Sequence, residues 1–117
     1  MGVQHFNQTK VYQKAFGLAM EIFEITKQFP PEEKYSLADQ IRRSSRSVCA
    51  CLAEAYLKKK YPAHFSSKLS DADMENSETG VWLDFSASCH YCGVGKHHEP
   101  IRKNEKKDRL LDRMINF

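Results

Sequence analysis

Residues 8–29 read QTKVYQKAFGLAMEIFEITKQF, and this stretch decides the fold. Apolar side chains recur in it at alternating steps of four and three residues: Val11, Ala15, Leu18, Ile22, Ile25 and Phe29. At about 3.6 residues per turn these side chains share one face of a helix, and lysine, glutamine and glutamate fill the opposite face. Two prolines follow Phe29, and a residue before proline is pushed out of the helical region. The pattern predicts an amphipathic helix over residues 8–29.

The rest of the chain continues the same pattern, with no segment that alternates apolar and polar residues as a strand would. Pro31 suits the first turn of a second helix, and Tyr61-Pro62 marks the turn after it. Gly93 and Gly95 are natural terminators of a third helix. The expected helices span residues 8–29, 32–60, 63–92 and 100–115. Short connections place neighbouring helices antiparallel, so the sequence predicts one all-α domain over residues 1–117, an antiparallel up-down four-helix bundle.

Composition narrows the class of protein. The chain has 117 residues, a net charge of +3 and 41% hydrophobic residues, which suits one globular domain and argues against disorder. A sequence pI near 8.7 is mildly basic, below the value of about 9 that marks a dedicated nucleic-acid domain. Met1–Lys10 has no apolar core segment, so we expect no signal peptide, a cytoplasmic location and free thiols at all four cysteines.

The first helix carries a second apolar stripe beside the main one, formed by Tyr12, Phe16, Ala19 and Phe23. One interpretation is a broad core face in a small bundle. The other is an interface with another subunit, because contiguous apolar surface is seldom left in water. Both remain open at the level of sequence.

Two stretches resemble a known family. Residues 29–45, FPPEEKYSLADQIRRSS, and residues 69–83, LSDADMENSETGVWL, resemble motifs of the bacterial four-helix bundle family, also called the 23S rRNA intervening-sequence protein family. The resemblance implies an up-down four-helix bundle that assembles into a homo-oligomer, typically a pentameric ring. Some members are encoded inside intervening sequences of ribosomal RNA genes, which suggests RNA binding. The resemblance supplies no catalytic residues.

The chain also departs from the family pattern. Residues 51–55 read Cys-Leu-Ala-Glu-Ala, whereas family members usually have Asn-(Ile/Leu)-Ala-Glu-Gly there. Alanine in place of glycine raises helix stability by about 1 kcal/mol. The change favours a purely structural helix in this segment.

The polar residues that match the family are Gln40, Arg43, Glu54, Glu75 and Glu78, together with Arg42. Glu75 and Glu78 are one turn apart and share a face, so both could meet Arg43 across the bundle or between subunits. We interpret this group as a structural polar cluster that fixes register and assembly. A paired-carboxylate active site is the alternative, but the Glu-x-x-His motif of bundle metal sites is absent. We expect no enzyme activity and no cofactor.

One string resembles a metal site: Cys89-x-x-Cys92 followed by His97 and His98. Thiolate and imidazole are zinc ligands, and the spacing could close a site. The competing interpretation is that the cysteines are small apolar residues packed at a helix end. A redox role is disfavoured, because the end of a helix that carries the negative dipole disfavours a thiolate.

Two basic groups are candidates for nucleic-acid contact: Arg42, Arg43 and Arg46, and Lys58, Lys59 and Lys60. Phosphate contacts need lysine or arginine on one exposed surface. Neither group has interleaved aromatic residues along the sequence, so solvated faces or ion pairs between subunits are the alternative.

These observations favour a non-catalytic, self-assembling helical module that binds structured RNA or another macromolecule. The rival hypothesis is a small-ligand or metal-binding bundle that uses the region of Cys89, Cys92, His97 and His98.

Overall fold

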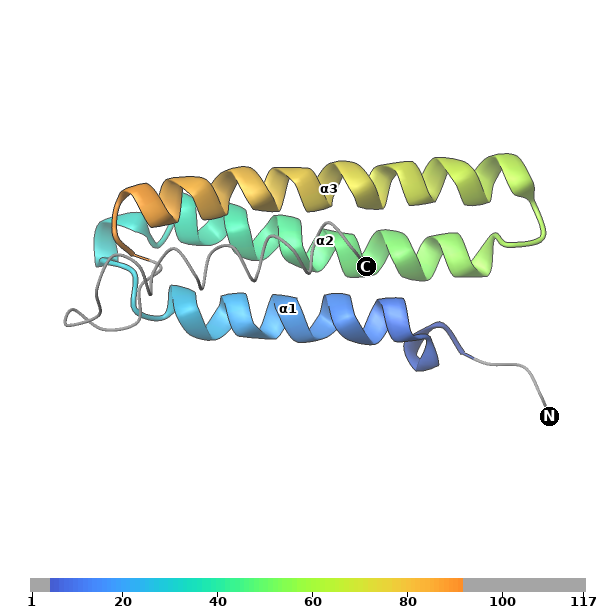
Figure 1. The fold of residues 1–117 in the computed structure, drawn as a ribbon, viewed down its shortest axis with the longest axis horizontal. Coiled ribbons are helices and arrows are strands. Elements are labelled where there is room, and N and C mark those ends of the chain that lie inside the picture. The colour runs from blue at the N-terminus through green and yellow to red at the C-terminus, as the bar shows by residue number, and fades with distance from the viewer. Residues whose placement is uncertain (1–4, 92–117) are drawn as a thin grey trace.

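The computed structural model describes residues 5–91, and all regular structure within that range is helical. The elements are η1 (Phe6–Gln8), α1 (Lys10–Thr26), η2 (Pro31–Glu33), α2 (Leu37–Leu57) and α3 (Pro62–Ser88). Figure 1 shows the three long helices side by side, each antiparallel to the one before it. The expected all-helical class is therefore confirmed for this range. The fourth helix expected at residues 100–115 lies outside the described residues. Residues 5–91 contain three long helices.

Helix α1 is shorter at both ends than the predicted span of residues 8–29. Thr9 has an extended backbone, and its side-chain oxygen accepts a hydrogen bond from the Tyr12 N–H at 3.3 Å, which makes Thr9 the N-cap. After Thr26 the α-helical hydrogen bonds give way to a tighter turn, in which the Phe29 N–H donates to the Thr26 carbonyl three residues back. The Phe29 ring is buried against the start of α2. The apolar stripe thus extends beyond the helix itself.

Helix α2 begins at Leu37 and not at residue 32 as predicted. The stretch Pro31–Glu33 forms one 3-10 turn, and Ser36 leaves the helical region with φ −125° and ψ −95°. The Glu33 carboxylate accepts hydrogen bonds from the Ser36 hydroxyl at 2.6 Å and from the Leu37 N–H at 3.3 Å. Glu33 therefore acts as the acceptor for a free N–H at the start of α2.

Helix α3 ends at Ser88, before the predicted end at residue 92. His90 adopts the left-handed conformation with φ 64°, and the Tyr91 N–H donates to the Ser86 carbonyl at 2.8 Å. This six-to-one hydrogen bond closes a helix in the same way as a glycine terminator does. Histidine tolerates left-handed backbone better than most residues, so the helix ends without reaching Gly93.

Helix α2 packs against both of its neighbours, whereas no Cα atom of α1 lies within 8 Å of one in α3. One buried cluster joins all three helices through Leu18 and Ile22 of α1, Ile41 of α2 and Leu83 of α3. A second cluster uses small residues such as Ala15, Val48 and Ala72. In α2, the residues at steps of four or three along one face are all buried: Leu37, Ile41, Ser44, Val48, Leu52 and Ala55.

Small hydroxyl side chains fill the contact between α2 and α3. Ser44 and Thr79 are fully buried, and their oxygens lie 2.7 Å apart. The Thr79 hydroxyl also reaches the Glu75 carbonyl at 2.8 Å, and the Ser86 hydroxyl donates to the Trp82 carbonyl at 2.8 Å. Because these hydroxyls have partners, burying them costs little, and their small size lets the two helices approach closely.

Helix α3 carries apolar residues around much of its circumference. Ala72, Thr79 and Leu83 face the core, while Met74, Val81 and Phe85 are 68%, 47% and 54% exposed. Within residues 5–91 no helix has the length and apolar character needed to cross a membrane.

Candidate nucleic-acid interface

An aromatic ring of α1 lies beneath the basic residues of α2. The guanidinium carbons of Arg42 and Arg46 lie 4.7 Å and 5.8 Å from the centre of the Phe23 ring. The Lys27 amino nitrogen lies 4.9 Å from the same centre. Cations within about 6 Å of an aromatic centroid are attracted by the negative face of the ring. Three cations, two from α2 and one from the residue that follows α1, therefore gather around Phe23. We call these four residues the basic face.

Arg42 is held in one orientation by α1. Its Nε–H donates to the Thr26 hydroxyl oxygen at 2.6 Å, and its Nη2–H reaches the Phe23 carbonyl at 3.5 Å. Thr26 is buried, and its own hydroxyl donates to the Ile22 carbonyl at 2.8 Å. The Thr26 oxygen thus accepts from Arg42 while its hydrogen is used elsewhere. This arrangement fixes the guanidinium without any carboxylate.

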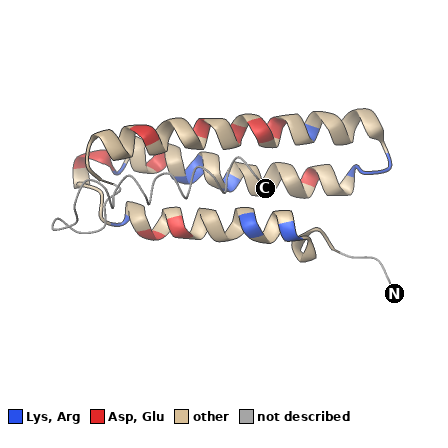
Figure 2. Ribbon diagram, viewed as in Figure 1, with Lys and Arg blue, Asp and Glu red and all other residues tan. Residues whose placement is uncertain are grey.

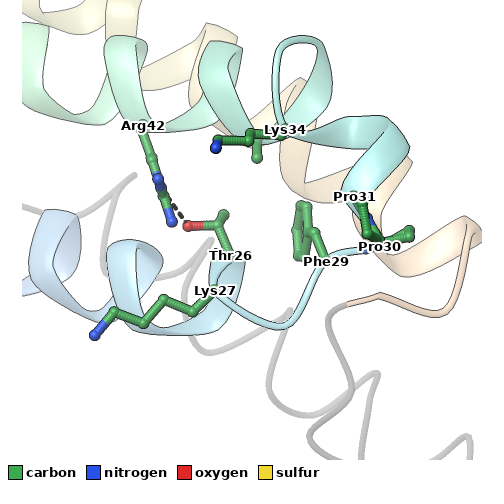
Figure 3. Close-up of a pocket in the computed structure, with 8 residues that line it drawn as sticks. Thr26, Lys27, Phe29, Pro30, Pro31, Lys34 and Arg42 are labelled. Carbon is green, nitrogen blue, oxygen red and sulfur yellow. Dashed lines mark hydrogen bonds between the residues drawn. The ribbon is translucent and has the colours of Figure 1, made fainter.

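A cavity of about 320 Å³ lies next to Arg42, where α1 turns into α2 (Figure 3). Its lining combines three cations with apolar and hydroxyl groups: Thr26, Lys27, Phe29, Pro30, Pro31, Lys34, Ala38 and Arg42. Among residues 5–91, no acidic side chain lines it. The cavity is therefore positively charged.

The neighbouring arginine faces the other side of α2. The Arg43 Nη2–H donates to Gln40 Oε1 at 2.7 Å, and Nη2 lies 3.7 Å from Glu78 Oε2 on α3. The Trp82 Nε1–H donates to the same Glu78 oxygen at 3.3 Å. Consecutive helical residues point about 100° apart, which separates Arg43 from the basic face.

The second basic group lies at the far end of α2. Lys58, Lys59 and Lys60 are exposed in the turn before α3, and Figure 2 shows basic residues at this turn. The Lys59 amino nitrogen lies 4.2 Å from the centre of the Tyr56 ring. At a rise of about 1.5 Å per residue, sixteen residues separate this group from Arg42 by about 24 Å. The two groups are separate sites on the same helix.

Of the five residues expected to form a structural polar cluster, three come together: Gln40, Arg43 and Glu78. Glu54 pairs instead with Lys68, at 2.9 Å, and this contact raises the pKa of the Lys68 amino group. Glu75 Oε1 is buried with no hydrogen-bond partner among residues 5–91. The two glutamates one turn apart therefore do not share an arginine.

The four residues of the second stripe on α1 lie in three different environments. Tyr12 and Phe16 stack with ring centres 6.1 Å apart, and Phe16 is 50% exposed. Ala19 is buried in the core beside Val48. Phe23 lies under the arginines. Tyr12 also packs against the core cluster of Ala19 and Val48. Three of the four residues are thus used within the subunit, and Phe16 is the member of the stripe that remains largely exposed.

A second cavity, of about 410 Å³, lies between the start of α2 and the end of α3. Its lining includes Tyr35 and Leu37 before and in α2, and Trp82 and Phe85 in α3. Phe85 also belongs to the exposed apolar side of α3. The rings of Tyr35, Trp82 and Phe85 thus meet in one cavity, a grouping that their positions along the sequence do not indicate.

Of the four residues in the metal-like string, only Cys89 is described, and it is exposed at the end of α3. Cys92, His97 and His98 lie outside the described residues. Within residues 5–91 no three or more His, Cys, Asp or Glu side chains gather as a metal site would require. Cys49 is buried, and burial raises the pKa values of the Cys49 and Cys51 thiols, so both favour the protonated form.

The comparisons with known proteins agree with this architecture. The family model of the 23S rRNA-intervening sequence protein matches residues 7–113, which is most of the chain. The protein belongs to the 23S rRNA-intervening sequence protein family. No curated protein matches the chain.

A crystal structure of a bacterial protein is similar to this chain over almost its whole length. It is a protein of unknown function from the S23 ribosomal protein family of Bacteroides thetaiotaomicron VPI-5482. The two chains are 26% identical with a TM-score of 0.65, over 90% of this chain and 91% of that one. The similarity to this structure supports the fold of the chain and says nothing of an activity.

Proposed function

We propose that this protein is a non-catalytic helical module that assembles into a ring of identical copies and binds structured RNA. A fourth helix over residues 100–115 that completes an up-down bundle, and a cytoplasmic location, are parts of the proposal. Membership of the 23S rRNA-intervening sequence family and the ribosomal name of the Bacteroides relative support RNA as the first partner to test.

The observation that carries the proposal is the gathering of Arg42, Arg46 and Lys27 around Phe23. Within residues 5–91 neither arginine forms an ion pair with a carboxylate. Arginine that no carboxylate neutralises is suited to phosphate oxygens, and positioning contacts to RNA are mostly made to the backbone. A ring would repeat this face once per subunit, so weak contacts would add through avidity.

Self-assembly is supported by the exposed apolar side of α3. Met74, Val81 and Phe85 lie at steps of seven and four residues, which places them on one face of the helix. Contiguous apolar surface of this kind usually marks an interaction site. A contact between two different patches of neighbouring copies closes into a ring when the rotation allows.

Light scattering after size-exclusion chromatography tests the assembly. We expect a mass of about five subunits for the wild type, as the family resemblance implies, and a smaller mass for Val81→Glu because a charge is placed in the contact. Leu57→Glu is the matched control, since Leu57 is 69% exposed but lies at the end of α2. A monomeric wild type, or the same loss of mass in both variants, contradicts assembly through α3.

RNA binding is tested with a fluorescent hairpin RNA at several salt concentrations. We expect Arg46→Gln to weaken binding about five- to tenfold and to reduce the salt dependence by about one phosphate contact. Arg43→Gln removes the same charge three residues away but on the side of α3, so binding should be almost unchanged. Equal losses in the two variants, or affinity that does not depend on salt, contradict the proposal.

A further inference from the structure

The cavity beside Arg42 has the features of a site for a small anion. Arg42 uses its Nε–H on Thr26 and one Nη2–H on the Phe23 carbonyl. A guanidinium has five N–H donors, so three remain. Arg42 lines the cavity. Within residues 5–91 its guanidinium makes only the two hydrogen bonds just named, so the three remaining N–H groups have no acceptor there.

Lys34 supplies a second positive charge. It follows η2 and lines the same cavity, and Figure 3 shows its amino group turned to the side where the Arg42 guanidinium lies. No ion pair within residues 5–91 involves Lys34. Lys27, the third cation, pairs with Glu24 at 3.3 Å and extends away from the other two in Figure 3. The charge of the cavity therefore rests on Arg42 and Lys34.

The cavity is also preorganised. Arg42 stacks on Phe23 and is tied to Thr26, which is 4% exposed. Pro30 and Pro31 form the opposite rim, and their rings fix the φ angles of the turn. A side chain that is already ordered loses little conformational entropy when a ligand binds. The acid nearest along α2, Asp39, is exposed and forms no ion pair with Arg42.

We propose that this cavity binds a phosphate group, with the free N–H donors of Arg42 and the amino group of Lys34 as its ligands. Arginine presents a fork that matches two phosphate oxygens, and lysine acts as a point charge on a third. The phosphate belongs either to RNA or to a small phosphorylated molecule. This inference deepens the proposed function, because it names the group of the RNA that is held and the residues that hold it.

The first experiment titrates the full chain with inorganic phosphate and follows the Arg42 Nε–H signal and the backbone amides by NMR. We expect saturable shifts at Arg42, Thr26 and Lys34, while sodium chloride at equal ionic strength produces none. Lys34→Met should weaken phosphate binding about tenfold, because one charge-assisted contact is lost. The matched control Lys59→Met removes a lysine at the other end of α2 and should bind phosphate as the wild type does.

A second variant separates charge from geometry. Arg42→Lys keeps the positive charge but loses the fork, so we expect it to bind phosphate more weakly than the wild type. Thermal unfolding of each variant, followed by circular dichroism, identifies any loss of binding that comes from loss of the fold. Shifts that chloride reproduces, or equal phosphate affinity in the wild type and Lys34→Met, overturn the proposal.

The hairpin RNA distinguishes the two sources of phosphate. If Lys34→Met weakens RNA binding and free phosphate competes with RNA, the cavity holds a phosphate of the RNA. If phosphate binds but the wild type binds no RNA, the proposed function fails and the cavity stands as a site for a small phosphorylated ligand. If RNA binds equally to both proteins and phosphate causes no shift, the cavity proposal fails and RNA binding stands.

Discussion

The side-chain oxygens of Ser44 and Thr79 lie 2.7 Å apart in the contact between α2 and α3, and both residues are fully buried. Thr79→Val keeps the shape of the side chain but removes the partner of the Ser44 hydroxyl, whose other contact, to the Ile41 carbonyl, is 3.4 Å long. We expect the free energy of unfolding to fall by about 1–2 kcal/mol, since a buried hydroxyl then lacks a good partner. Urea denaturation followed by circular dichroism, at constant protein concentration, measures the change.

The double variant Ser44→Ala/Thr79→Val is the control for that pair. Because neither hydroxyl remains without a partner, its loss of stability should be smaller than the sum of the two single losses. Additive losses would mean that the two hydroxyls do not interact in solution.

Leu83 joins the core cluster of all three helices and is 1% exposed. Leu83→Ala should reduce the free energy of unfolding by about 2–5 kcal/mol, because it removes buried methyl groups and leaves a cavity. Leu57→Ala makes the same chemical change at a side chain that is 69% exposed, and it should alter stability by no more than about 0.5 kcal/mol. Similar losses in the two variants would contradict the packing described for α3.

The N-cap of α1 gives a third test. Thr9→Ala removes the acceptor of the Tyr12 N–H and should lower the free energy of unfolding by about 1 kcal/mol. Thr9→Ser keeps the side-chain oxygen and should remain close to the wild type in the same urea titration. If serine fails to retain the stability that alanine loses, the hydroxyl is not the group that matters.

Tyr91 provides a test at high pH. Its hydroxyl donates to Glu33 Oε2 at 3.1 Å, and burial together with this contact raises the pKa of Tyr91 to about 12. A tyrosine whose pKa is higher in the folded state contributes stability that is complete below its unfolded pKa of about 10 and is lost as the pH rises towards 12. The wild type should therefore lose stability relative to Tyr91→Phe above about pH 10. A stability difference that stays constant through that range would contradict the raised pKa of Tyr91.

Local pattern was enough to predict the helical class and most of the core. The residues of α2 at steps of four or three from Leu37 to Ala55 are all buried, but the buried face is wider, because Ala38, Ser45 and Cys49 beside them are buried as well. The predicted start of α2 at residue 32 was wrong for a local reason that spacing does not reveal. Glutamate is a good helix former, so the spacing placed Glu33 inside the helix. In the structure its carboxylate instead accepts hydrogen bonds from the Ser36 hydroxyl and the Leu37 N–H, and α2 starts after it.

The basic face could not be found by reading along the chain. Arg42 and Arg46 have no aromatic residue interleaved between them, and the ring they share, Phe23, comes from another helix. Lys34 likewise lies eight residues before Arg42 in the sequence, and the two are brought together by the cavity that both of them line. The expectation that Arg43 belongs with Arg42 followed from adjacency in sequence, whereas a helix separates adjacent side chains by about 100°.

That separation has a consequence for how the chain tolerates changes in length. Arg42 is bonded to α1 and Arg43 contacts α3, so the rotational phase of α2 is fixed from both sides at once. One residue inserted within α2 before Ile41 would turn everything after it by about 100°, drawing charge into the core and moving leucine and valine into water. Insertions and deletions should accordingly be confined to the turns at residues 27–36 and 58–61, where a change of length leaves the phase of every helix intact.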